Sequence, residues 1–297
     1  MAFPQSAGYQ NLPNGAFSPV NYSKKVLLIL KKKAVYDLIT NTEFEGEINQ
    51  QGDTVQIIQQ PLVTVSAYTR GQQLSIQGLT DQQISLVVDQ GQYYAFPMDD
   101  IELKQEHVSF ENMASDSAAY SLRNAIDIDM LSTINSGVSS TTALGAVTVG
   151  FGPDNTYTPM DLISAECRIL DQQNVPEEDR WTVKSPAFYE YLRREDSKVI
   201  DAMVMGTSES AARDPRLFMS LNLHGFTMLK SNNLPTSGTV GLAGHKQSTA
   251  TATSILESEM IRNPNSFGNI YRGLVVYGRK VLRPKALVSA TITLADS

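Results

Sequence analysis

The sequence predicts an α+β fold in which one long helix and several strands form a body, while an arm and a hairpin extend from it. Three observations carry this prediction. Apolar residues recur at helical spacing over 109–136, strand-like alternation is found on both sides of that segment, and residues 1–23 show no periodic apolar spacing. With 41% apolar and 19% charged residues in 297, the chain can bury a sizeable core.

The composition argues against several classes of protein. The single cysteine, Cys167, can form no internal disulfide and offers no thiol cluster for zinc. The apolar run 26–30 is bounded by lysines and is far shorter than the about 20 residues of a membrane helix. A net charge of −7 disfavours a protein whose main task is to neutralise phosphates. No secretion signal follows Met1, so we expect synthesis in a cytoplasm and no membrane partner.

The first 44 residues predict an arm followed by a short helix. Proline or glycine interrupts residues 1–23 about every fourth position, which predicts an arm that cannot pack alone. The next segment, 22–39, has apolar residues at helical spacing and lysines on the remaining face. We therefore expect an amphipathic helix there, with its apolar face at Val26, Ile29, Leu30, Ala34 and Leu38.

Residues 45–92 predict strands and turns that include a long two-stranded hairpin. Alternation at 62–67 and 84–88 predicts its strands, and the polar stretch 68–74 around a glycine suits its tip. An isolated hairpin is marginally stable in water, so we expect this one to rest on another chain. The predicted subunit-contact residues are those of the tip: Tyr68, Arg70, Gln72 and Gln73.

The segment 109–136 predicts a helix of about 40 Å at 1.5 Å per residue. Apolar residues recur every fourth position from Phe110 to Ile134, Ser109 can cap the start, and Gly137 suits a left-handed exit. A strict four-residue step overshoots the helical turn, so the apolar stripe rotates along the helix. We therefore expect its two ends to pack against different layers.

A mixed α and β lobe is expected after this helix. It begins with Thr158 as N-cap and Pro159 in the first turn, and Cys167 shares one face with Met160, Ile163 and Leu170. Cys167 is therefore interpreted as a buried apolar residue rather than a reactive thiol. The further expected elements are a strand at 180–183, a helix at 185–193, a strand at 225–229 and strands separated by a bend at 269–294.

The chemistry-bearing residues do not form a recognisable site. The histidines are isolated, and neighbouring carboxylates such as Asp127 and Asp129 are expected on solvated faces. A phosphate loop is not formed at 238–248, because His245 separates a glycine from the lysine and Gln247 stands where a hydroxyl is required. We expect no catalytic, cofactor or metal site, although an enzyme with His224 or His245 as a base remains an alternative.

The carboxy-terminal run 267–288 resembles the ending of tailed-bacteriophage major capsid proteins. In that family an aromatic-Gly-x-Lys pattern precedes a basic-Pro-x-Ala-Leu pattern, and the matching residues here are 277–280 and 283–287. The order of parts also resembles the Hong Kong 97-type capsid fold along essentially the whole chain. An encapsulin-like nanocompartment shell protein, which shares this fold, remains the nearest alternative.

The resemblance implies a division of the chain into capsid domains. These are an N-terminal arm at 1–23, a short peripheral helix at 24–44, an extended loop at 45–80, a peripheral domain with the spine helix at 81–137 and 269–297, and an axial domain at 138–268.

The resemblance also implies a function. It predicts a non-enzymatic major capsid protein that self-assembles through pentamers and hexamers into the icosahedral head around double-stranded DNA, without sequence-specific binding. The implied partners are copies of itself, a scaffolding protein that is a separate chain, a portal and decoration proteins. No cofactor is implied, and the expected location is the virion, after assembly in the host cytoplasm.

Overall fold

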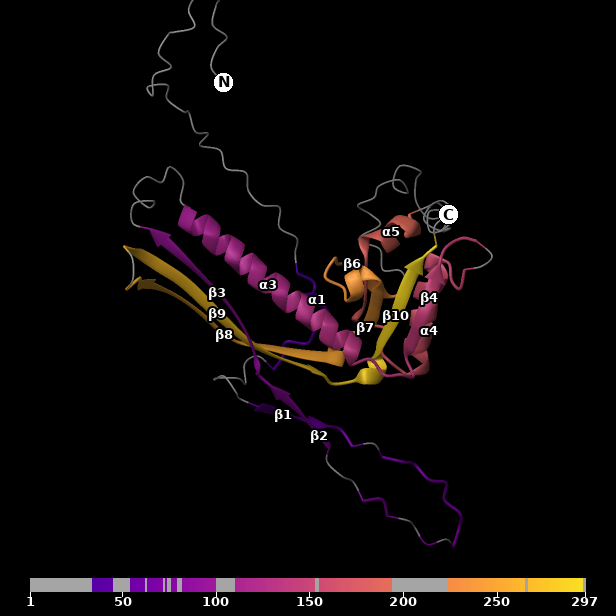
Figure 1. Ribbon diagram of the computed structural model, residues 1–297. Helices are drawn as coiled ribbons and strands as arrows, with labels where there is room; N and C mark the ends of the chain where they lie inside the picture. The colour runs from indigo at the N-terminus through magenta and orange to yellow at the C-terminus, as the bar shows by residue number, and fades with distance from the viewer. Residues whose placement is uncertain are drawn as a thin grey trace, which may run out of the picture.

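The structure is a computed structural model that describes residues 34–44, 54–61, 63–71, 73, 76–78, 82–99, 110–152, 155–193, 224–264 and 267–295. The expected arm, the first part of the expected amphipathic helix and the Ser109 cap lie outside these residues. Figure 1 shows the long helix α3 (Phe110–Ser136) lying along one sheet and reaching a second sheet with its C-terminal end. The long helix expected from the sequence is therefore confirmed.

The described strands form three sheets. The first is antiparallel, with β9 (Gly268–Val281) between β3 (Gln90–Asp99) and β8 (Thr249–Arg262). The second has the order β4 (Ala143–Val149), β10 (Leu287–Leu294), β7 (Val240–His245), β5 (Arg180–Lys184) and β6 (Phe226–Lys230). The third is the antiparallel pair β1 (Thr54–Gln59) and β2 (Gln82–Val87).

Helix α3 packs on both larger sheets, which confirms that its two ends face different layers. Ile126 and Met130 pack in one cluster with Val275 of β9. Leu131 and Ile134 belong to another cluster, formed with strands of the five-stranded sheet. The four-residue apolar step of the sequence thus carries the stripe from the first sheet to the second.

The end of α3 departs from the expectation, because Gly137 does not have a positive φ. Its amide N–H donates to the carbonyl oxygens of Thr133 and Ile134 at 3.0 and 3.1 Å. A Cβ at this position would lie 2.5 Å from Cγ2 of Val281 on β9. Gly137 is therefore needed for the close approach of helix and strand, not for a left-handed turn.

The expected amphipathic face of the first helix is wrong at its C-terminal end. Helix α1 (Tyr36–Ile39) has four residues and buries Tyr36 and Ile39, while Leu38 is 46% exposed. The backbone N–H groups of Val35 and Tyr36 both donate to the buried carboxylate of Asp127 on α3. This anchor fixes the rotation of α1, so periodicity alone does not decide which side chains are buried.

The helices of the second half begin where the sequence predicts. Helix α4 (Pro159–Gln172) is capped by Thr158, whose side chain accepts the N–H of Asp161, and helix α5 (Pro186–Leu192) is capped by Ser185. Both helices pack on one face of the five-stranded sheet. Cys167 of α4 is half-buried rather than fully buried, and burial raises the pKa of its thiol.

The boundaries of the sheets differ from the expected domain ranges. Strand β8 lies within the range 138–268, yet it pairs with β9 in the three-stranded sheet. Strand β10 lies within 269–297, yet it pairs with β4 and β7 in the five-stranded sheet. Strands β8 and β9 are consecutive in the chain, and the bend at η6 (Pro284–Ala286) turns the next strand into the other sheet. As capsid domains, the ranges stay predictions.

A buried ion pair joins the five-stranded sheet to helix α4. Nζ of Lys184 on β5 donates to Oε1 of Glu166 on α4, and both side chains are fully buried. Thr182 adds hydrogen bonds to Glu166 Oε2 and to the carbonyl oxygen of Leu242. A Cβ at Gly241 would lie 2.6 Å from Lys184 Nζ, so the strand beside the lysine must lack a side chain there.

We expect Gly137→Ala to lower the free energy of unfolding by about 1–3 kcal/mol, because the new methyl group overlaps Val281. Urea unfolding of the subunit measures the change. Gly91→Ala is the control, since its Cβ would meet only Leu274 Cδ1 at 3.9 Å. A double variant that adds Val281→Ala should recover part of the loss, and equal loss without recovery would refute the steric explanation.

Lys184→Met alone should destabilise the protein by about 3–5 kcal/mol, because it leaves the Glu166 carboxylate buried without its partner. The double variant Lys184→Met with Glu166→Leu should be much less destabilised, since it removes both charges. Urea unfolding of both variants and of Glu166→Leu completes a double-mutant cycle. Additive losses would show that the two side chains do not act as a pair.

Candidate subunit-contact surfaces

The outer half of the hairpin is not covered by its own chain. Every described residue from 60 to 78 is exposed. Figure 1 shows this part extending away from the two larger sheets and from α3. The chain reverses at Arg70 and Gly71, and the φ of 88° at Gly71 lies in the left-handed region that favours glycine.

The hairpin is packed against the body at its base and carries exposed apolar side chains in its outer half. At the base Val55 pairs with Leu86, and both pack against Val276 of β9 on the side opposite to α3. In the outer half, beyond the paired strands, Val65 and Ile76 are 93% and 94% exposed. Apolar side chains of the hairpin are therefore buried at the base and uncovered farther out.

The outer half is not a regular ladder, although the sequence predicts a strand at 62–67. The described residues 63–67 form no strand, and the pairing strands are β1 and β2 instead. The backbone N–H of Thr64 donates to Oε1 of Gln77 across the hairpin at 3.0 Å. Among the described residues, strand pairing within the hairpin is thus confined to its base.

The predicted tip residues lie at and beside this turn. Tyr68 is 69% exposed, and Arg70 and Gln73 are also exposed. Gln72 lies outside the described residues. The structure therefore brings three of the four to one end of the hairpin, and their contact with another subunit stays a prediction.

The outer face of the three-stranded sheet is a second exposed surface. On β3, Tyr93, Ala95 and Pro97 are exposed, while Tyr94 and Phe96 on the opposite face are partly buried. Sequence reasoning missed this surface. Aromatic residues occur on both faces of β3, so residue type did not show which face is uncovered.

Leu274 and an ion pair extend this outer face across the sheet. Leu274 of β9 lies opposite the 77% exposed Tyr93 and is itself 37% exposed. Arg272 of β9 pairs with Glu259 of β8, and both side chains are about half exposed. Asp99 is also exposed on the same face of β3. The outer face therefore combines apolar side chains with charged ones that could orient a partner.

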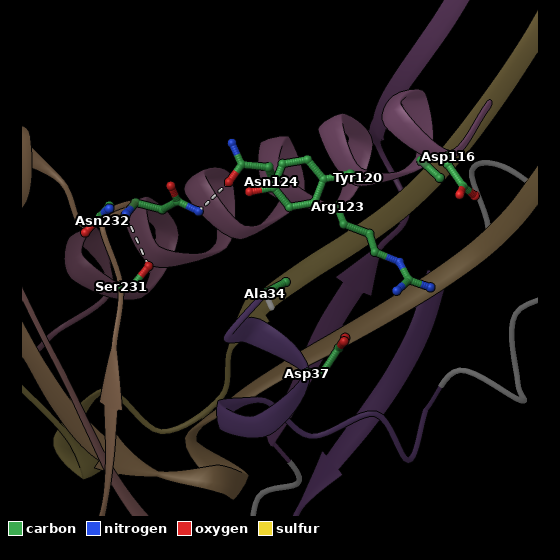
Figure 2. Close-up of a pocket in the computed structure, with 10 residues that line it drawn as sticks. Ala34, Asp37, Asp116, Tyr120, Arg123, Asn124, Ser231 and Asn232 are labelled. Atoms are coloured by element: carbon green, nitrogen blue, oxygen red, sulfur yellow. Dashed lines mark hydrogen bonds between the residues drawn. The ribbon is translucent and has the colours of Figure 1, made fainter. Parts of the chain in front are cut away.

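A polar pocket of about 590 Å³ lies between α3, α1 and the segment after β6 (Figure 2). Arg123 enters it from α3 and Asp37 from α1. At its inner end Asn233 donates to Oδ1 of Asn124 at 2.7 Å and to Oδ2 of Asp127 at 2.8 Å. The lining offers no nucleophile paired with a base, so the pocket suits packing or recognition more than catalysis.

The histidines do not supply a catalytic arrangement in the described residues. His245 is 7% exposed, its Nδ1 accepts the N–H of Gln247 at 3.1 Å, and burial lowers its pKa. His224 lies in the turn before β6 with a φ of 51°, and His107 is outside the described residues. No group of three or more His, Cys, Asp or Glu side chains among the described residues could hold a metal ion. No helix in the same part of the chain is long and apolar enough to cross a membrane.

Comparison with known proteins identifies relatives. A family model described as phage capsid protein matches residues 95–290. A search of curated proteins gives no match. Among solved structures, one from Mycobacterium phage Che8 is similar with a TM-score of 0.78 and 27% identity, covering 92% of this chain and 97% of that chain.

Two further structures show the same fold at lower identity. The capsid of Cyanophage P-SCSP1u has a TM-score of 0.72 and 19% identity over 94% of each chain. A structure from Gordonia phage Cozz has a TM-score of 0.70 and 13% identity, covering 100% of this chain and 99% of that one. The family match spans more than half of the chain, and the similarity of fold spans nearly all of it. The chain therefore belongs to the phage capsid protein family, and it is a major capsid protein of a tailed phage with the Hong Kong 97-type fold.

Proposed function

We propose that copies of this protein assemble through pentamers and hexamers into an icosahedral head around double-stranded DNA, and that each hairpin lies over a neighbouring copy. The observation that carries the proposal is the uncovered apolar surface of the outer hairpin. Val65 and Ile76 are almost fully exposed there, whereas Val55 and Leu86 at the hairpin base are buried. Their cover comes from a second copy.

Each subunit gains free energy when these exposed apolar side chains are buried. Burying a large aliphatic side chain contributes about 1.5–3 kcal/mol. The contact recurs for every copy, and closed rings of copies multiply it without requiring any single contact to be strong. Modest contacts of this kind also allow wrongly placed subunits to dissociate during assembly.

The outer face of the three-stranded sheet is the surface that we assign to the neighbour's hairpin. It offers the exposed apolar side chains of Tyr93 and Leu274. The exposed pair of Arg272 and Glu259 can orient the polar tip, in which Arg70 is the charged residue. This assignment makes Tyr68, Arg70, Gln72 and Gln73 contact residues between subunits.

The remaining parts of the proposal concern partners and location. The protein acts as a structural subunit without catalytic activity, in a virion assembled in the host cytoplasm. A separate scaffolding protein, a portal and decoration proteins are the expected partners. The net charge of −7 suits a shell that encloses DNA without sequence-specific binding. A nanocompartment shell is the alternative, and the match to a phage capsid family favours a phage head.

Replacing Val65 and Ile76 together with serine should prevent shell formation while leaving the subunit folded, because the apolar cover is lost but the body is unchanged. Electron microscopy and sedimentation of protein co-expressed with its candidate scaffolding protein measure assembly. The matched control is Thr64→Ser with Ser66→Ala, which changes the polar residues on either side of Val65. Normal shells from the Val65 and Ile76 variant would contradict the proposed hairpin contact.

Tyr68→Ala with Arg70→Ala should raise the subunit concentration needed for assembly by about tenfold or more, because an interface aromatic and an interface arginine are both truncated. Light scattering against subunit concentration gives this threshold. Thr69→Ala, at the same turn, should leave the threshold within about twofold of the native protein. If the Tyr68 and Arg70 variant assembles at the same subunit concentration as the native protein, the tip is not part of the interface.

A further inference from the structure

A second pocket, of about 470 Å³, lies where the two larger sheets join. The chain passes there from β9 of the three-stranded sheet to β10 of the five-stranded sheet (Figure 1). The lining comes from the segment after α3, the end of α4, the end of β7 and the bend between β9 and β10: Ser139, Gln173–Pro176, His245 and Arg283–Ala286.

All titratable side chains that line this pocket are cationic or neutral bases. They are Arg283, Lys285 and His245, and no carboxylate lines the pocket. This local charge is opposite to the net charge of −7 of the whole chain. The polar pocket beside α1 differs, because Asp37 and Asp116 line it together with Arg123.

The two charged side chains on the bend are available to a ligand. Arg283 and Lys285 are both exposed, and neither forms an ion pair with any residue that the structure describes. Arg180 of β5 differs from them. Its guanidinium already forms an ion pair with Asp171 at 2.8 Å and donates hydrogen bonds to backbone carbonyl oxygens. Arginine and lysine without internal partners are the usual ligands of phosphate groups.

The walls of the pocket are held by backbone hydrogen bonds. The N–H groups of Leu282 and Arg283 both donate to the carbonyl oxygen of Ser248, at 2.8 and 3.1 Å, and the N–H of Ser139 donates to Pro284 at 3.2 Å. The N–H groups of Asn174 and Val175 donate to the carbonyl oxygens of Asp171 and Leu170 at 2.9 and 3.1 Å. The lining segments are therefore fixed before any ligand arrives, which lowers the entropic cost of binding.

Acidic side chains near the pocket reduce its affinity for anions, but they do not line it. Glu177, Glu178 and Asp179 are exposed and follow directly on the pocket wall at Pro176. None of the three lines the pocket. Their charge reduces the attraction for distant anions, so binding must depend on direct contacts with Arg283 and Lys285.

We propose that this pocket binds a phosphate group through Arg283 and Lys285, with Ser139 and Asn174 as neutral hydrogen-bonding partners. The guanidinium fork of arginine matches two oxygen atoms of a phosphate, and the lysine adds a point charge. The phosphate comes either from the backbone of enclosed DNA or from free phosphate in solution. The site uses no residue of the hairpin or of the outer sheet face, so it stands independently of the proposed subunit contact.

The test measures uptake of labelled inorganic phosphate by the full chain in equilibrium dialysis, at constant ionic strength set with chloride. We expect saturable binding to one site per chain. Arg283→Gln with Lys285→Gln should weaken it by about tenfold or more, because both charge-assisted contacts are lost. Ser139→Ala should weaken it by a smaller factor.

The matched control is Arg193→Gln with Lys280→Gln, which removes the same charge at exposed positions that do not line the pocket. Its binding should stay within about twofold of the native protein. Circular dichroism and urea unfolding establish that each variant is folded. Absence of saturable phosphate binding, or equal weakening in the control and the pocket variant, would overturn the proposal.

A short DNA duplex distinguishes the two sources of phosphate. If the duplex displaces labelled phosphate, and itself binds the pocket variant more weakly than the control variant, the ligand is the DNA backbone. If labelled phosphate binds in the pocket but the duplex does not displace it, the ligand is free phosphate. Both results support the site.

Discussion

The buried carboxylate of Asp127 holds together the three segments on which the rest of the fold depends. It is 1% exposed and accepts the N–H groups of Val35 and Tyr36 at 2.9 Å each, while Asn233 donates to its second oxygen at 2.8 Å. A buried carboxylate is tolerated only when hydrogen bonds replace its water. The start of α1, the middle of α3 and the segment after β6 are therefore fixed to one another by a single side chain.

A second carboxylate on α3 fixes the helix to the three-stranded sheet. Asp129 accepts the hydroxyl of Tyr277 at 2.7 Å and lies 2.8 Å from Arg279, both on β9, and burial raises the pKa of Tyr277 above its ordinary value. Residues two apart in a helix point about 200° away from each other. Asp127 and Asp129 therefore reach opposite sides of α3, and the expectation that they are solvated is wrong for Asp127. Together they set the position of α3 between the two parts of the subunit.

Local signals in the sequence were sufficient for the helix starts and for strands such as β5 and β6, but β1, β3, β4, β7 and β8 were not predicted individually. Contacts between distant residues decide several of the other differences. Thr158 and Ser185 mark helix starts by bonds within four residues, and the stripe of α3 shows its two packing layers. The phase of α1 depends on Asp127, and the role of Gly137 depends on Val281, each far away in the chain. At the candidate interface, Gly71 shows the turn locally. The exposure of Val65 and Ile76 and the exposed face at Tyr93 are seen only in the folded structure.

Folding of the subunit and association with a neighbour depend on different parts of the chain. The polar anchors on α3 and the buried pair of Lys184 and Glu166 act within one subunit, so they support folding before any partner is present. The outer hairpin contributes little to that stability, because its apolar face meets solvent. A subunit that covered Val65 and Ile76 itself would be more stable, but it would gain no further free energy from burying them against a neighbour. Leaving that face open therefore couples the burial of apolar surface to the arrival of a neighbour.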